Sequence, residues 1–499
     1  MNKKYLKHLF KSNKVLSIFV IISQIAIYGL SYFTMFGGKN DVRFVNANGL
    51  MLTILMGLTY ILPVIIFSFV HNKKAVDTYF ALPVTRKEIL ISNIIFMVAV
   101  IYLPFFILSM ILGLISNIKI IYLLTILLVA LVSGLSILIF NVGMLMIGNS
   151  LIDGVIIMIA YSFVPLMLQG LIVTVSNKII YGFYEAIFDI TMYSSMLMST
   201  VNVTNGIYYL MKGVTFTISN SEIIGFITSC LIHLGLGIYS IKKNFLERKV
   251  ERAESISDKF FAYPFIIHLY AVALIFIVSF SVYGEPTLSR VFKEAFIWYV
   301  LIWILYICAM FIYRRKLSIK LKSVVFIVVF SILSLLLVNI TVKTEGFGLS
   351  YNYPRNPVNE RIHYDRYINY SDSDLYRKIS IQPEADASLE IFFDFDVTDR
   401  EPKKAEMLEY FNLIRDESIK NYFNGDDQYV GYLDVYVNYN EAYPYSGSIN
   451  YNYNNVKLTL EQLQYINDNF TEVHVNVDYY DAITGEWKYE EYTLNEILK

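Results

Sequence analysis

The chain has 499 residues, of which 56% are hydrophobic and 17% are charged, and its mean hydropathy of +0.50 excludes an ordinary soluble protein of this size. Its net charge of −1 hides a partition, because residues 1–342 carry 27 Lys and Arg against 13 Asp and Glu, whereas residues 343–499 carry 14 against 29. A basic apolar part and an acidic polar part predict two physical environments. The two cysteines, Cys230 and Cys308, both lie in apolar stretches, which excludes a disulfide framework.

Nine apolar runs are long enough to cross a bilayer, which takes about 20 helical residues. The basic start of the chain resembles a signal peptide, but the apolar run after it lacks a small-residue cleavage site, so we expect it to be retained. The predicted spans are 15–36, 50–70, 93–116, 120–147, 154–175, 221–241, 263–283, 295–313 and 323–341.

The orientation of these spans follows from Lys and Arg in the short connections, because basic loops stay in the cytoplasm. The richest segments are 1–14, 71–92, 242–262 and 314–322, and the alternate connections carry few basic residues. The sequence therefore predicts a cytoplasmic N-terminus. An odd number of spans then places residues 342–499 outside the cell membrane.

The tail alternates strand-like and helix-like patterns, which predicts an extracytoplasmic α+β domain. A helix is expected to open at Asp399 and Pro402 and to run to about Phe423. The polar stretch 344–375 is expected to be irregular. Strands are predicted at 378–382, 389–397, 429–438 and 448–453, a capped helix at 459–467, and a hairpin of 472–480 with 486–493.

The fold class is thus an α-helical polytopic membrane protein with about nine transmembrane helices and a C-terminal α+β domain. The chain divides into a cytoplasmic amphipathic segment, a six-span domain, a cytoplasmic linker, three further spans and the outer domain. These parts are 1–14, 15–241, 242–262, 263–341 and 342–499.

The sequence offers no energy source of its own. A transporter driven by protons or sodium usually carries Asp, Glu or Lys within its spans. The cores of the nine runs contain none, and Glu222 stands only at the outer end of the run 221–241. His233 and His268 are interpreted as hydrogen-bonded packing residues. No phosphate loop, GxSxG elbow, HExxH helix or EF-hand spacing occurs, so we predict no catalytic, cofactor or metal site, no enzyme activity and no nucleic-acid partner.

The connection 71–92 has the features of an interfacial helix. Pro83 interrupts a first short segment, and Thr85 followed by Glu88 is the pattern of a capping box. Apolar and charged residues follow in the helix that this box opens. Such a helix suits the bilayer surface while offering polar contacts to a soluble partner, although a plain interfacial connector would have the same spacing.

Residues 77–89, DTYFALPVTRKEI, closely resemble the "LPvsRkei" loop after the second span of bacterial ABC-2-type permeases. The resemblance extends over the N-terminal segment, the first six spans and the long connection 176–220. In that family the loop is a coupling helix that docks in a cleft of the ATP-binding subunit. The resemblance therefore implies ATPase-coupling residues: Tyr79, Leu82, Pro83, Arg86, Lys87 and Glu88.

This resemblance implies the permease subunit of an ATP-binding cassette exporter for a hydrophobic, peptide or envelope-related substrate. A separate ATPase subunit would be its partner, and the permease would work as a homodimer or as a heterodimer with another permease. Three extra spans and the tail exceed the usual six-span unit. Permeases of low-GC Gram-positive bacteria that append such a domain have a similar organisation.

Other interpretations remain at this stage. The protein could be a membrane-anchored sensor or scaffold whose outer domain binds an envelope ligand or peptide, or an envelope enzyme with a site in the tail. The family implies re-entrant helices in 176–220, but an amphipathic outer loop fits equally well. The alternating Tyr and Asn of the tail could bind sugars or peptides, although a half-exposed sheet explains them more simply.

Overall fold

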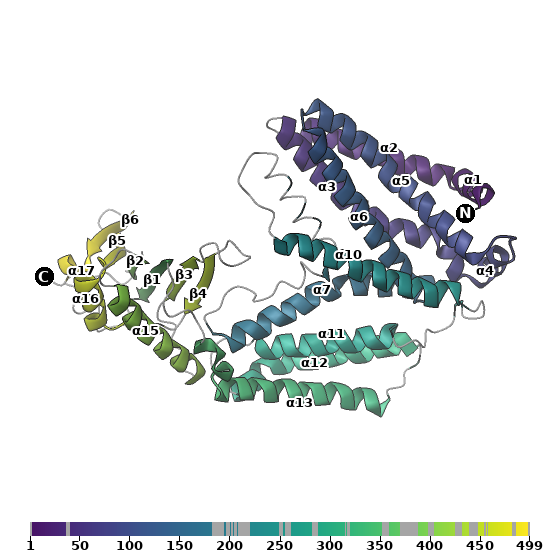
Figure 1. Cartoon of the computed structure of the whole chain (residues 1–499). Coiled ribbons are helices and arrows are strands. Elements are labelled where there is room, and N and C mark those ends of the chain that lie inside the picture. Colours follow the sequence, from purple (N-terminus) through teal and green to yellow (C-terminus); the bar gives the residue numbers. More distant parts are fainter. Residues whose placement is uncertain are drawn as a thin grey trace. The chain divides into compact units, whose positions relative to one another are not determined.

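A computed structural model describes the chain in two compact units (Figure 1). The first unit is Met1–Gln169, Asp189–Tyr270 and Tyr306–Ile319, and the second is Gly170–Phe188, Ala271–Leu305 and Lys320–Lys499. The description covers all residues except 1, 36–39, 182–193, 196–199, 201–202, 204–206, 208–219, 249–252, 255–260, 282–287, 315, 317–319, 352–358, 370–387, 398–403, 425–431, 439–447, 454–455, 457, 482–485 and 498–499.

Within the described residues, nine helices are long and apolar enough to cross a membrane, which agrees with the nine predicted spans. Their length and composition are those of a helical multi-pass membrane protein. They are α2 Lys14–Leu30 with the π-helical turn η1 Ser31–Met35, α3 Asn40–Ile66, α5 Arg86–Ile115, α6 Ile120–Leu145, α7 Leu151–Ile179, α10 Asn220–Ile241 with η3 Lys242–Leu246, α11 Tyr263–Phe280, α12 Leu288–Arg314 and α13 Leu321–Lys343.

Short helices flank the first spans. The amphipathic α1, Lys3–Ser12, is capped by Asn2, whose side chain accepts from the backbone of Lys4 and Tyr5, and it buries Tyr5 and Leu9. The 3₁₀ turn η2, Ser68–His71, and the helix α4, Lys73–Phe80, follow α3. These short elements lie in the segments that the charge pattern marks as basic.

Helices α6 and α10 cross with their backbones in contact, at Gly143 and Gly237. A Cβ atom added to Gly143 would lie 2.7 Å from the carbonyl oxygen of Gly237, and one added to Gly237 would lie 2.7 Å from the carbonyl oxygen of Ile139. The hydroxyl of Ser240 also donates to the carbonyl of Gly143 at 2.7 Å. Small residues permit such close approach between membrane helices.

Helices α11, α12 and α13 are instead joined by buried hydroxyl groups. Ser279 of α11 contacts Tyr299 of α12 at 2.7 Å between oxygens and donates to Ser334 of α13 at 2.9 Å. The indole of Trp303 donates to the hydroxyl of Ser331 at 3.1 Å. All five side chains belong to the second unit.

The C-terminal residues contain one antiparallel sheet in the order β4-β3-β1-β2-β5-β6. Aromatic and aliphatic side chains such as Phe393, Phe411, Leu463 and Val475 are buried there. The elements are η5 Gly346–Tyr351, β1 Asn359–Asn369, β2 Ser388–Val397, α15 Lys404–Asn424, β3 Tyr432–Asn438, β4 Ser448–Tyr453, α16 Leu460–Asn469, β5 His474–Asp481, β6 Glu486–Thr493 and α17 Leu494–Ile497.

One prediction for this region is wrong. Residues 344–375 were expected to be irregular, but η5 and β1 lie within them, and β1 pairs with β2 on one side and with β3 on the other. The sequence NERIHYDRYIN carries charges that interrupt the alternation expected of a strand. Pairing with two distant strands therefore overrides a weak local signal. The strand predicted at 378–382 lies outside the described residues.

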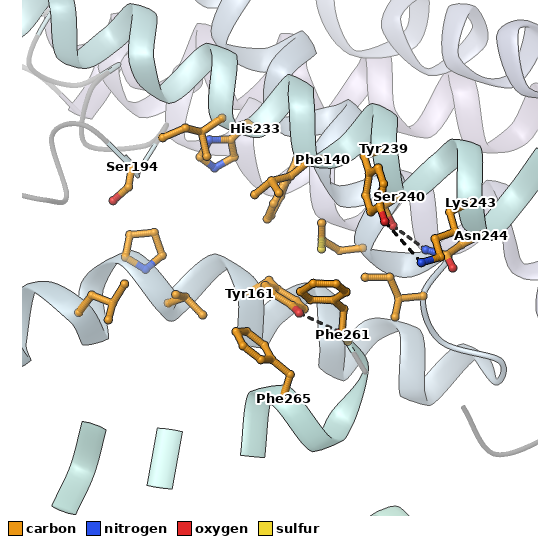
Figure 2. Close-up of a pocket in the computed structure, with 17 residues that line it drawn as sticks. Phe140, Tyr161, Ser194, His233, Tyr239, Ser240, Lys243, Asn244, Phe261 and Phe265 are labelled. Atoms are coloured by element: carbon orange, nitrogen blue, oxygen red, sulfur yellow. Dashed lines mark hydrogen bonds between the residues drawn. The ribbon is translucent and has the colours of Figure 1, made fainter. Parts of the chain in front are cut away.

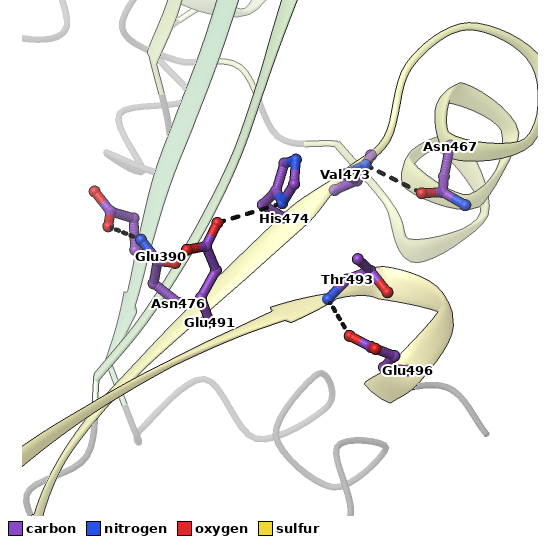
Figure 3. A network of polar contacts seen from close by, with 8 residues as sticks. All are labelled: Glu390, Asn467, Val473, His474, Asn476, Glu491, Thr493 and Glu496. Carbon is purple, nitrogen blue, oxygen red and sulfur yellow. Dashed lines mark hydrogen bonds and ion pairs between the residues drawn. The ribbon is translucent and has the colours of Figure 1, made fainter.

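Polar contacts connect the neighbouring strands β2, β5 and β6 of this sheet (Figure 3). The amide of Asn476 donates to Glu390 at 2.9 Å, and His474 lies 3.5 Å from Glu491. The predicted cap of α16 is present, since the backbone of Gln462 donates to the hydroxyl of Thr459. The backbone of Val473, just before β5, donates to the side chain of Asn467 in α16 at 3.0 Å. These contacts join the hairpin of β5 and β6 to β2 and to α16.

Candidate coupling site and membrane cavity

The predicted capping box is present at the start of α5. The hydroxyl of Thr85 accepts from the backbone of Glu88 at 3.3 Å, and the carboxylate of Glu88 accepts from the backbone of Thr85 at 3.1 Å. The box nevertheless opens the long helix α5 and not a short interfacial one. No helix breaker follows Thr85 until Pro104, so the helix continues into the span. The short helix is α4, which ends before Pro83.

The segment between α4 and α5, residues 81–85, forms an exposed tip. Leu82 is 39% exposed, and Pro83 and Lys87 are also exposed. Tyr79 is half-buried and stacks on Phe69, with 4.2 Å between ring centroids. The structure thus separates the six predicted residues into a group that faces outward (Leu82, Pro83 and Lys87) and a group that packs or caps (Tyr79, Arg86 and Glu88).

Arg86 ties the start of α5 to the end of η3. Its guanidinium donates to the carbonyl of Leu246 at 3.2 Å and to that of Arg248 at 2.6 Å. It also lies over the ring of Phe80, 4.2 Å from the centroid. Arg86 is therefore half-buried and engaged within the chain.

A second arginine, Arg248, continues this connection and was missed in the sequence. It is 3% exposed, and its guanidinium donates to the carbonyls of Met146, Gly148 and Asn149 at 3.2–3.4 Å. These carbonyls lie at the end of α6, where backbone oxygens have no helical partner. In the sequence Arg248 is one basic residue among several in 242–262. These residues predicted only the side of the membrane on which the segment lies, and nothing distinguished Arg248 from the others.

Three connections that are far apart in the sequence therefore meet at one end of the first unit. Besides the two arginines, the backbone of Lys73 donates to the carboxylate of Glu254, whose own backbone donates to the carbonyl of Asn149. The connections are those after α3, after α6 and after η3. Hydrogen bonds therefore join the connection after η3 to each of the other two.

The N-terminal helix α1 also reaches this end of the unit. Burial raises the pKa of Tyr5 to about 12, and the neighbouring hydroxyl of Tyr79 adds to the rise. This electrostatic influence indicates that Tyr5 of α1 lies near Tyr79 of α4.

An apolar cavity of about 500 Å³ lies between α6, α7, α10 and the start of α11 (Figure 2). All of its lining residues belong to the first unit. Lys243 and Asn244 stand at one end, and His233 and Ser194 stand at the other. The remaining wall consists of Phe140, Met144, Ile147, Tyr161, Val164, Pro165, Leu168, Ile232, Leu236, Tyr239, Ser240, Phe261 and Phe265.

The two histidines of the spans have partners within their own helices. Nδ1 of His233 lies 2.8 Å from the carbonyl of Ser229, and its ring packs on Phe140 with 4.7 Å between centroids. His268 contacts the carbonyl of Pro264 and lies 3.1 Å from the hydroxyl of Tyr306. These contacts agree with packing roles.

In the described part of the chain, no three His, Cys, Asp or Glu side chains gather into a group that could hold a metal. Most of the outer connection 176–220, for which re-entrant helices were considered, lies outside the described residues. The loop around the Tyr-Pro-Tyr turn of the tail lies outside them as well.

Comparison with known proteins gives no relative for this chain. No family matches the sequence, and no curated protein or solved structure shows a significant similarity. The function therefore has to be argued from the sequence and the geometry.

Proposed function

We propose that this chain is the membrane-spanning permease subunit of an ATP-binding cassette exporter, driven by a separate ATPase subunit. The observation that carries the proposal is the tip at 81–85. It exposes Leu82 and Pro83, while Arg86 and Glu88 beside it are engaged in the contacts that begin α5. An exposed apolar tip with a rigid base suits a soluble partner that pushes on the membrane helices.

The contacts of the tip give the six residues distinct roles in this proposal. Leu82, Pro83 and Lys87 would touch the ATPase. Glu88 holds the first turn of α5 through the capping box, and Arg86 carries displacement to the end of η3. Tyr79 fixes α4 on η2 through its stack on Phe69. Closure of the ATPase would then move α5 and α10 together.

The proposal includes a membrane orientation and an assembly. The N-terminus and the connections at the Arg86 end would face the cytoplasm, and residues 342–499 would form an extracytoplasmic α+β domain. The permease would act as a homodimer or as a heterodimer with another permease. The substrate would be a hydrophobic, peptide or envelope-related molecule.

The test is affinity purification of the full-length protein from its native cell in mild detergent. Lys87→Glu should abolish recovery of a co-purifying ATP-binding subunit, because it reverses the charge of an exposed residue in the first turn of α5, directly after the tip. Lys119→Glu is the matched control, since Lys119 is exposed in the connection before α6. Equal recovery of the ATPase with both variants, or its absence from the wild type, would contradict the proposal.

A sensor or scaffold is the second candidate, and a junction in the second unit favours it. The ring of Tyr181, just after α7, stacks on Tyr422 of α15 with 3.9 Å between centroids, and Lys178 lies over the same ring. Ser350 of η5 accepts from the backbone of Tyr181 and donates to the carbonyl of Ile179. A ligand that moved α15 would therefore act on the end of a membrane helix.

This second candidate predicts that signalling survives without ATP hydrolysis. Tyr422→Ala should abolish it, whereas Tyr465→Ala, an exposed tyrosine on α16, should not. The readout is the cell's response to envelope stress in a strain that retains the protein but lacks hydrolysis by its candidate ATPase. If the strain that lacks ATP hydrolysis also lacks this response, the permease is favoured over the sensor.

A further inference from the structure

The cavity of the first unit has one cationic end and is apolar along the rest of its length. Its walls carry the aromatic rings of Phe140, Tyr161, Phe261 and Phe265. Polar groups concentrate near the end of α10, where Ser240, Lys243 and Asn244 lie together (Figure 2). An apolar pocket with a few convergent polar groups is the usual form of a site for a small amphiphilic ligand.

Lys243 supplies the charge at this end. Its ammonium lies 3.4 Å from the hydroxyl of Tyr239 and 5.7 Å from the centroid of the same ring, and the side chain is exposed. Among the residues that the structure describes, no carboxylate forms an ion pair with this ammonium, so its positive charge is available to an anion. The amide of Asn244 donates to Ser240, which in turn donates to the carbonyl of Gly143. This chain of hydrogen bonds fixes the polar floor beside Lys243.

The opposite end of the cavity is lined by His233 and Ser194. His233 and Phe140 pack against each other there, and Nδ1 of His233 is engaged with the carbonyl of Ser229. Lys243 follows His233 by ten residues along α10 and η3, which at 1.5 Å per residue corresponds to about 15 Å. The site is therefore elongated along α10 and differs in character at its two ends.

We propose that this cavity binds an anionic amphiphile, with the acidic headgroup at Lys243 and the apolar tail extending along α10 toward His233. Lys243 lies in η3, near the end of the candidate span Ile223–Leu246, and the ends of membrane spans are where lipid headgroups lie. A cationic amphiphile would meet repulsion at the same point. The inference concerns binding and does not depend on the permease assignment.

The first experiment measures the preference for charge. The full-length protein in phosphatidylcholine nanodiscs is titrated with the fluorescent fatty acid cis-parinaric acid, and the alcohol and amine of the same chain compete with it. The wild type should bind the acid about tenfold more tightly than the alcohol, because hydrogen bonds to charged groups are the stronger ones. The amine should bind most weakly.

Lys243→Gln should remove the preference for the acid over the alcohol while leaving binding of the alcohol unchanged. Lys242→Gln is the matched control, because Lys242 is the preceding exposed lysine of η3 and does not line the cavity. If acid, alcohol and amine bind the wild type equally, or if the two variants behave alike, the proposal is wrong.

The second experiment tests the place of the tail. Leu236→Trp fills the middle of the cavity and should weaken binding of acid and alcohol alike, whereas Ile238→Trp, on the exposed part of α10, should change neither. Size-exclusion chromatography establishes that both variants are folded. Unchanged binding to a folded Leu236→Trp variant would overturn the proposed site.

The source of the amphiphile is distinguished by competition. Nanodiscs that contain phosphatidylglycerol should displace the fatty acid from the wild type if a membrane lipid occupies the site, and should leave it bound if the site takes a free amphiphile. Both outcomes support an anionic amphiphile. Displacement that is equal in the Lys242→Gln and Lys243→Gln proteins would show that lipid charge acts elsewhere, and would contradict the assignment of Lys243.

Discussion

Two groups of membrane helices in this chain are held together by different means. At the crossing of α6 and α10, Gly143 and Gly237 bring the two backbones into direct contact. Among α11, α12 and α13, the buried hydroxyls of Ser279, Tyr299 and Ser334 form the connection. Backbone atoms in contact cannot rotate away when the helices shift, whereas a hydroxyl group can rotate and form a hydrogen bond with another acceptor.

This contrast indicates which group of helices is the more rigid. Close packing of small residues is lost entirely when a side chain is inserted, but hydrogen bonds between membrane helices contribute only about 0.6 kcal/mol on average. The α6 and α10 pair also forms one wall of the cavity and leads to Lys243. We expect this pair to move as one body, and the α11–α13 group to adjust more readily.

The largest effect is expected for Gly237→Leu, because the new side chain would meet the backbone of α6. The free energy of unfolding should fall by roughly 3 kcal/mol or more, as for severe overpacking. The change should appear as a lowered midpoint of thermal unfolding in detergent. Gly235→Leu is the control on the same helix, since nothing lies within 4 Å of its added Cβ. Similar midpoints for the two variants would remove the distinction between the helix groups.

Arg248→Ala should have the next largest effect. It leaves the carbonyls of Met146, Gly148 and Asn149 without their charged donor. The free energy of unfolding should fall by roughly 3 kcal/mol or less. Limited proteolysis should then cut the connection between α6 and α7. Lys242→Ala, an exposed change on η3, should leave the digestion pattern as in the wild type.

Gly346→Ala tests a backbone contact inside the second unit, for comparison with the backbone contact of α6 and α10. Gly346 has φ of +69°, and an added Cβ would lie 1.9 Å from the carbonyl of Ile179. Gly348 has φ of +70° but nothing within 4 Å of its added Cβ, so Gly348→Ala carries only the conformational cost of about 1 kcal/mol. The first variant should be the less stable in thermal unfolding, and equal stability would show that the contact relaxes.

The smallest effect is expected for Tyr299→Phe, which removes one hydroxyl from the group between α11, α12 and α13. The free energy of unfolding should fall by about 0.6 kcal/mol. A double-mutant cycle with Ser334→Ala measures the coupling of the two side chains. A coupling as large as the effect of Gly237→Leu would contradict the view that this group is the adaptable one.

Much of the membrane part could be predicted from local sequence. Each span is an uninterrupted apolar run, and hydropathy alone reveals such runs because the bilayer imposes the same requirement on every residue of a helix. The capping boxes at Thr85 and Thr459 were equally visible, since their contacts join residues three positions apart. The boundaries of α5 were less accessible, because nothing after Thr85 separates an interfacial turn from the span.

The candidate site could be predicted only in part. The segment 77–89 was singled out from its local sequence. The engagement of Arg86 with the end of η3 was not expected, because its two acceptors lie 160 and 162 residues further along the chain. Arg248 and the cavity were missed for the same reason. Neither has a signature at short sequence separation.

Local sequence was therefore sufficient to predict which segments are apolar helices and where several of them begin, because these properties depend on neighbouring residues and on the solvent. Only the tertiary structure decided that β1 lies inside the sheet, that Gly143 meets Gly237, and that Lys243 stands at the end of a cavity. Each of these depends on packing between segments that are distant in the chain, and such pairing leaves no periodic trace in either segment alone.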